Sequence, residues 1–166
     1  MIDVAYVQQM ARYNRWQNEN LIGVADRLSD EERRSERGAF FGSIQKTFSH
    51  LLWADRMWMS RFTDLPKPEA ALSGSATLYP DWDGFKRERA AFDDRIIAWS
   101  RGLSDDRLKT DFTWFSNSVK AEVSKPLWLV VTHFFNHQTH HRGQVHAMLT
   151  QAGGKPHETD LFAMPE

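Results

Sequence analysis

Four stretches of this chain repeat apolar residues at the spacing of an α-helix, and this pattern restricts the fold more than any other feature. The stretches cover residues 6–28, roughly 43–62 and about 81–101, with a fourth that begins near Ser124 and stops at Gly153. In each stretch, apolar side chains recur along one side, as on the inward face of a helix packed against other helices. The pattern predicts an all-α fold, organised as a four-helix bundle.

Residues that start or stop helices stand at the ends of these stretches. Ser43 can cap the second helix, and Pro66 lies beyond its end. Gly102 is placed to end the third helix, because glycine commonly follows a helix C-terminus. For the fourth helix, we expect Ser124 to be the cap and Pro126 to lie in the first turn.

Two connections depart from the helical pattern. Residues 63–80 contain three prolines with glycine and serine, which predicts a long connection suited to either antiparallel or crossover topology. Residues 111–123, DFTWFSNSVKAEV, mix aromatic and β-branched residues around Ser116 and Asn117. This mixture predicts a short β-hairpin between the third and fourth helices. We expect one domain over residues 1–166.

The composition argues against several classes of function. Lys and Arg number 21 and Asp and Glu 22, so the formal charge of -1 gives no general attraction to nucleic acids or anionic membranes. There is no cysteine, so any metal must take nitrogen or oxygen ligands. The N-terminus has no signal-peptide pattern, and the longest apolar stretch, PLWLVVTHFF, is too short to span a bilayer. We expect a cytoplasmic protein with no membrane or nucleic-acid partner.

Histidines concentrate in the fourth helical stretch, where four of the seven lie between His133 and Gln144. Residues four apart project from the same face of a helix, so His133, His137 and His141 form a stack. His140 is also within reach of that face. Two imidazoles at this spacing can bind one metal ion, although surface histidines often share the same spacing. Spacing alone therefore leaves open which of these histidines are ligands.

Two features favour a metal site on this helix. His137 and His141 are interleaved with Phe134 and Val145, so part of the stack points into the core, where an imidazole needs a polar partner. Gly143 costs a helix interior about 1 kcal/mol relative to alanine, which predicts that another element packs closely against the backbone there.

A third protein ligand would come from His50, the only histidine outside the C-terminal third of the chain. It lies on the second helix beside Leu51 and Ala54, at the edge of the apolar face. If the second and fourth helices are neighbours, His50 can meet the stacked histidines, because metal sites in bundles are built from facing helices. The sequence contains neither the HExxH pattern of zinc proteases nor the Glu-x-x-His pairs of di-iron bundles.

Three segments of the sequence resemble the DinB-like (DinB/YfiT) family of metal-binding four-helix bundles. The segment NHQTHHRGQVHAML is similar to the C-terminal signature of that family. ARYNRWQNENLI resembles its first helix, and TFSHLLWADRMWMSRF resembles its second helix, which carries the first metal histidine. The resemblance covers nearly the whole chain. Carried over residue by residue, it implies that the ligands are His50, His137 and His141.

The same resemblance implies a divalent metal, nickel or zinc, with coordination positions left open, and a homodimer. It also implies a small-molecule substrate, with a low-molecular-weight thiol as a further ligand of the metal, because related bundles include thiol-dependent transferases and isomerases. Asn14, Arg142 and Gln144 are candidates for supporting the ligands, and no catalytic residue is assigned. We therefore expect a metal-dependent thiol transferase or hydrolase, with a non-catalytic metal-binding or stress-response protein as the alternative.

Overall fold

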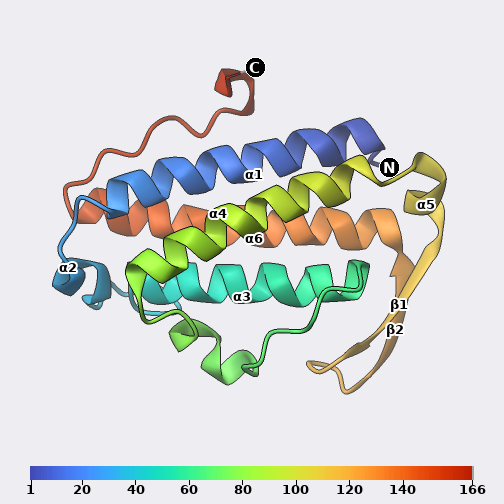
Figure 1. The fold of residues 1–166 in the computed structure, drawn as a ribbon, viewed down its shortest axis with the longest axis horizontal. Helices are drawn as coiled ribbons and strands as arrows, with labels where there is room; N and C mark the ends of the chain where they lie inside the picture. Colours follow the sequence, from blue (N-terminus) through green and yellow to red (C-terminus); the bar gives the residue numbers. More distant parts are fainter. Residues whose placement is uncertain (166) are drawn as a thin grey trace.

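The computed structural model describes residues 1–165, in which four long helices run side by side (Figure 1). The long helices are α1 (Val4–Ala25), α3 (Ile44–Phe62), α4 (Trp82–Arg101) and α6 (Leu127–Gln151). Shorter elements join them: α2 (Asp30–Arg34), η1 (Leu72–Thr77), α5 (Asp105–Lys109), the strands β1 (Asp111–Ser116) and β2 (Ala121–Pro126), and η2 (Leu161–Ala163). The predicted helical bundle with a β-hairpin between the third and fourth long helices is confirmed.

The four long helices form two pairs. The helices within a pair are parallel, and the two pairs point in opposite directions. α1 and α6 run one way, while α3 and α4 run the other way (Figure 1). α1 packs against α4 and α6, and α3 packs against the same two helices. Because α3 and α4 point in the same direction, residues 63–81 must return along the bundle, which makes this connection a crossover. Among residues 1–165, no helix has the length and apolar character needed to cross a bilayer.

Short polar side chains fix the starts of three long helices. Asp3, Ser43 and Asp81 each accept a hydrogen bond from a backbone N–H in the first turn, which satisfies a donor that the helix itself leaves free. α6 ends at Gln151, and Gly153, whose φ of +80° suits glycine, follows two residues later. The next residue, Gly154, donates its N–H to the carbonyl of Leu149 at 2.8 Å.

The start of α6 differs from the sequence prediction. Ser124 does not cap the helix, because it lies in β2 and accepts a hydrogen bond from the Thr113 hydroxyl across the hairpin at 3.0 Å. Pro126 ends β2 and precedes the first helical residue, Leu127. The first helix is also shorter than predicted, since α1 ends at Ala25.

Gly143 is a second point of difference. Apart from the backbone of its own helix and its chain neighbours, no described atom lies within 4 Å of the position that a Cβ would occupy, and the residue is exposed. The prediction that another element packs closely against this glycine is therefore wrong for the part of the chain that the structure describes.

A buried polar network joins all four long helices at the centre of the bundle. Arg89 of α4 donates to Asp55 of α3 at 2.6 Å and to Asp93 of α4 at 2.8 Å. All three side chains are at most 2% exposed. Burial raises the pKa of both carboxyl groups, and Arg89 opposes that effect. Burial also acts to lower the pKa of Arg89, but the two carboxylates outweigh it and keep the guanidinium charged.

Side chains of α1 and α6 complete this network. Asn14 and Asn18 donate to Asp93 at 3.1 and 3.0 Å. Gln138 of α6 donates to Asp55 at 3.0 Å, and Arg142 donates to the Asn14 side-chain oxygen. Burial lowers the pKa of Arg142 to about 10, so this group is still protonated at neutral pH. Two positive and two negative charges thus balance inside the bundle.

Candidate metal centre

Two neighbouring helices, α3 and α6, bring three histidines together. His50 comes from α3, and His137 and His141 come from successive turns of α6. One ring nitrogen of each lies within 4.8 Å of the corresponding nitrogens of the other two. These three residues are the ones that the family resemblance singles out from the sequence.

The separations between the rings suit a shared divalent ion. The Nε2 atoms of His137 and His141 lie 3.1 Å apart. Two nitrogens bound at about 2.1 Å, at an angle of about 90 to 110°, lie about 3.0 to 3.4 Å from each other. The ring of His50 is centred 4.8 Å from that of His141. A set of three imidazoles is a donor set that zinc and nickel both accept, so the residues fit such an ion.

Gln144 orients the His141 ring. The amide oxygen of Gln144 lies 2.9 Å from Nδ1 of His141, so this nitrogen carries the proton and donates it to the amide. That tautomer leaves the lone pair of His141 Nε2 directed at the histidine cluster. The Gln144 amide nitrogen lies 3.3 Å from His140 Nε2, and this second contact fixes the orientation of the amide. A partner on the outer nitrogen is a regular feature of histidines that bind metals.

Ser75 contacts the outer nitrogen of His50, as Gln144 contacts that of His141. Its hydroxyl oxygen lies 2.9 Å from Nδ1 of His50, which leaves Nε2 for the cluster. Ser75 belongs to η1, in the long crossover between α3 and α4, and is fully buried. The neighbouring Ser49 donates to the Ser75 carbonyl at 2.7 Å and holds η1 against α3. Sequence reasoning missed Ser75, because nothing in a proline-rich connection indicates which residue returns to the helix.

Burial keeps the clustered histidines neutral. It lowers the pKa of His50 to about 4 and that of His137 to about 3, with neighbouring histidines as smaller causes. The pKa of His141 is also lowered, again mainly by burial. His50 and His141 are only 5% and 7% exposed. Neutral imidazole is the form that binds metal, so at pH 7 an ion would not have to displace protons from these rings.

Aromatic rings form the wall of the site. The Phe41 ring stacks on the His50 ring with centroids 4.0 Å apart and lies 5.5 Å from that of His141. Trp53 also stacks on His50, at 5.7 Å, and its indole N–H donates to the Ala70 carbonyl. This apolar wall accounts for the burial of the imidazoles and therefore for their lowered pKa values. Sequence reasoning missed the role of Phe41.

The other histidines of the sequence lie outside this group. The exposed ring of His133 is centred 6.1 Å from His137 and 5.3 Å from Trp58. His140 is exposed beside Gln144, His146 lies further along α6, and His157 lies in the tail beside Asn20.

Of the three residues that were candidates for supporting the ligands, one lies at the histidine cluster and two lie elsewhere. Gln144 contacts a histidine of the cluster. Asn14 and Arg142 instead belong to the buried polar network at the centre of the bundle.

Comparison with known proteins identifies the family of this chain. The model of the DinB family matches residues 1–166. The chain belongs to the DinB family. Protein DinB of Bacillus subtilis (strain 168) is 26% identical to it over 174 residues, covering 96% of this chain and 92% of that protein. The crystal structure of a DinB-like protein from Bacillus cereus ATCC 10987 matches with a TM-score of 0.53 and 23% identity, over 86% of this chain and 90% of that one.

The structural likeness to the Bacillus cereus protein concerns the fold. What this DinB-family chain can do chemically depends on its own residues. Among residues 1–165, the three clustered histidines form a group whose arrangement could hold a metal ion. The rings of His50 and His141 are buried and each is oriented by a hydrogen bond to its outer nitrogen, and that of His137 is half-buried. Burial lowers the pKa of all three, so they are neutral before any ion arrives.

Proposed function

We propose that this DinB-family protein binds a divalent ion, nickel or zinc, through His50, His137 and His141, and acts as a metal-dependent enzyme. The reaction class we propose is thiol-dependent transfer to, or hydrolysis of, a small electrophilic substrate. The observation that supports this proposal most strongly is the convergence of three neutral imidazoles whose ring nitrogens lie within 4.8 Å of one another.

The ligand set determines the chemistry that such a site supports. Three neutral histidines fill only part of a coordination sphere and contribute no negative charge. A divalent ion held there would act as a Lewis acid that lowers the pKa of a bound water or thiol. The chain contributes orientation, through Gln144 and Ser75, and the exclusion of water, through Phe41 and Trp53. It has no cysteine, so an added thiol meets no protein sulfur that competes for the ion.

Titration of the cobalt-substituted protein with small thiols tests this proposal. Glutathione, bacillithiol and mycothiol are added in turn at millimolar concentration while the near-ultraviolet spectrum is recorded. At least one should produce an intense charge-transfer band, because sulfur would bind directly to the ion. His141→Ala should abolish the band, and His133→Ala, on an exposed residue of the same helix outside the cluster, should retain it. If no thiol changes the cobalt spectrum, hydrolysis or metal binding without catalysis becomes the better account.

We also propose that the protein is a homodimer. Support comes from the family resemblance and from exposed aromatic side chains, including Phe40 at 83% and Phe162 at 89%. Light scattering should therefore give twice the 19.3 kDa mass of the chain. A monomeric mass throughout the micromolar range would contradict the proposal.

A further inference from the structure

A cleft of about 310 Å³ lies between the C-terminal half of α3 and the β-hairpin. Arg61 of α3 and Lys67 of the following connection line it on one side. Phe112, Trp114 and Phe115 of β1 line it on the other side. Its volume is at the lower end of the range for pockets that bind small molecules.

The charges of this cleft are all of one sign. Among the described residues that line it, only Arg61 and Lys67 are charged, and none is acidic. Among residues 1–165, neither side chain has an ion-pair partner within 4.0 Å. Glu122 faces Phe115 across the hairpin, but it is exposed and does not line the cleft. The cleft therefore carries a positive charge that the described chain does not neutralise.

Arg61 is held in place although it lacks an acidic partner. Its guanidinium lies 4.5 Å from the centre of the Trp58 ring, in a cation–π arrangement. The residue is half-buried, and this burial lowers the pKa of the guanidinium. A cation withdrawn from water without a counter-charge is unfavourable, and an anion in the cleft would remove that cost.

The opposite wall is aromatic and partly exposed. Phe112 and Trp114 stack with centroids 5.9 Å apart, and Phe115 is 58% exposed. An exposed phenylalanine next to unpaired cations is an arrangement that suits a ligand with one flat apolar part and one anionic part.

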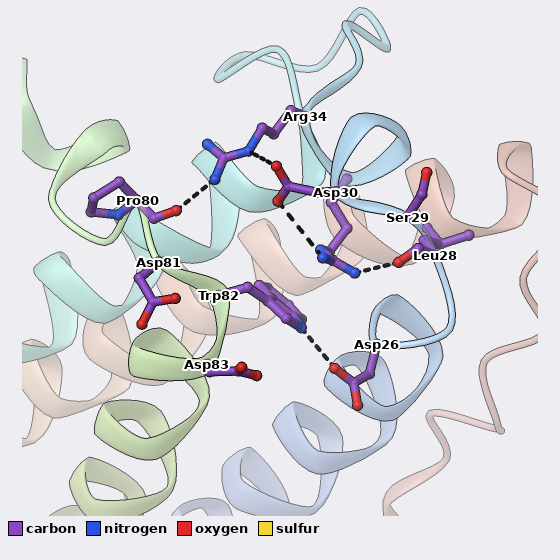
Figure 2. Close-up of a pocket in the computed structure, with 10 residues that line it drawn as sticks. Asp26, Leu28, Ser29, Asp30, Arg34, Pro80, Asp81, Trp82 and Asp83 are labelled. Atoms are coloured by element: carbon purple, nitrogen blue, oxygen red, sulfur yellow. Dashed lines mark hydrogen bonds and ion pairs between the residues drawn. The ribbon is translucent and has the colours of Figure 1, made fainter.

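Two other hollows of the molecule contain paired charges. In the hollow around Trp82 (Figure 2), Arg34 pairs with Asp30 at 2.7 Å, and the Trp82 indole donates to Asp26 at 2.8 Å. In the groove between α1 and α4, Arg15 pairs with both Glu19 and Asp94. Acidic side chains therefore line both of these hollows, in contrast to the cleft beside the hairpin.

We infer that the cleft between α3 and the hairpin binds a small aromatic anion, with its carboxylate or phosphate group at Arg61 and Lys67 and its ring against Phe115. This site is separate from the metal centre. Arg61 follows His50 by eleven residues of α3, about 16 Å along a helix that rises 1.5 Å per residue. Binding there does not depend on the ion.

Binding of benzoate and phenyl phosphate, with neutral benzamide as the matched probe, tests this inference by NMR titration. Both anions should bind at least about tenfold more tightly than benzamide, and the tighter of the two identifies the preferred anionic group. Arg61→Gln and Lys67→Gln should each weaken anion binding about tenfold, as expected for loss of a charge-assisted hydrogen bond. Phe115→Ala should weaken both anions without unfolding the protein, because this ring is largely exposed.

Lys125→Gln is the control, because Lys125 lies on β2 of the same hairpin, is exposed and does not line the cleft. It should leave anion binding unchanged, and His137→Ala should do the same. Equal affinity for benzoate, phenyl phosphate and benzamide would overturn the inference. So would an equal effect of Lys125→Gln and Lys67→Gln, or loss of binding in His137→Ala, which would assign the anion to the metal centre. Arg61→Lys, which keeps the charge, should retain more affinity than Arg61→Gln.

Discussion

Replacing His137 with alanine should remove the divalent ion from a protein that otherwise carries about one per chain. His137 is the member of the cluster whose Nε2 lies 3.1 Å from that of His141, so its removal leaves two ligands on different helices. Element analysis of the purified proteins, after removal of any polyhistidine tag, measures the effect. Equal metal content in wild type and His137→Ala would show that the ion, if present, binds elsewhere.

Two other histidines of α6 provide matched controls for this experiment. His133→Ala and His146→Ala remove imidazoles that lie on the same helix outside the cluster, and both should keep the full metal content.

Acid should release the ion only well below the ordinary histidine pKa of about 6.5. The reason is that burial lowers the pKa of His50 to about 4 and that of His137 to about 3, so protons begin to compete for these rings only as the pH falls toward those values. Loss of the metal between pH 7 and 6 would contradict this assignment.

Local sequence signals were sufficient to predict the four long helices. The predicted second helix, 43–62, corresponds to α3 with Ser43 as its cap, and the third agrees with α4 within one residue. Caps and glycine stops act within a single turn, so the chain specifies them without reference to distant residues. The predicted start of α6 was wrong for the opposite reason. Ser124 pairs with Thr113 across the hairpin, and the pairing of two strands depends on residues outside the helix.

The candidate site was only partly predictable. Helical spacing placed His137 and His141 on one face, but the same spacing admitted His133 and His140, and only the family resemblance chose among them. Packing separates them in the structure, because Phe41 and Trp53 enclose one end of the stack and leave His133 exposed. Ser75 and Phe41 come from connections whose return to α3 depends on tertiary contacts that a periodic pattern does not encode.

Two adjacent aspartates near the polar network also show what a sequence pattern alone cannot predict. Asp93 and Asp94 are consecutive in the sequence and equivalent in composition, yet one is buried and the other is exposed. Their difference is set by the 100° that separates successive residues around a helix, which turns Asp93 toward α1 and α3. Asp55 is buried on the apolar face of α3, and its pairing with Arg89 explains how a carboxylate is tolerated there.

Replacing Asp93 with alanine should lower the free energy of unfolding by about 3 to 5 kcal/mol, the usual effect of removing one partner from a buried ion pair. Asp93 accepts hydrogen bonds from Asn14, Asn18 and Arg89, and all of these donors are buried. The substitution leaves two amides without their acceptor and reduces the negative charge that balances the guanidinium. Denaturant unfolding followed by circular dichroism, at matched metal loading, measures the change.

Asp94→Ala is the matched control, because it makes the same substitution one residue further along the same helix. Within residues 1–165, Asp94 pairs only with Arg15, in a bridge whose side chains are 67% and 45% exposed. Such exposed pairs contribute about 0 to 1 kcal/mol. The two variants have the same net charge and differ little in helix propensity, so a difference of several kcal/mol between them can come only from burial and from the partners of each carboxylate. Equal destabilisation by both would mean that the network does not hold the four helices together, and that the stability of the bundle comes from its apolar contacts.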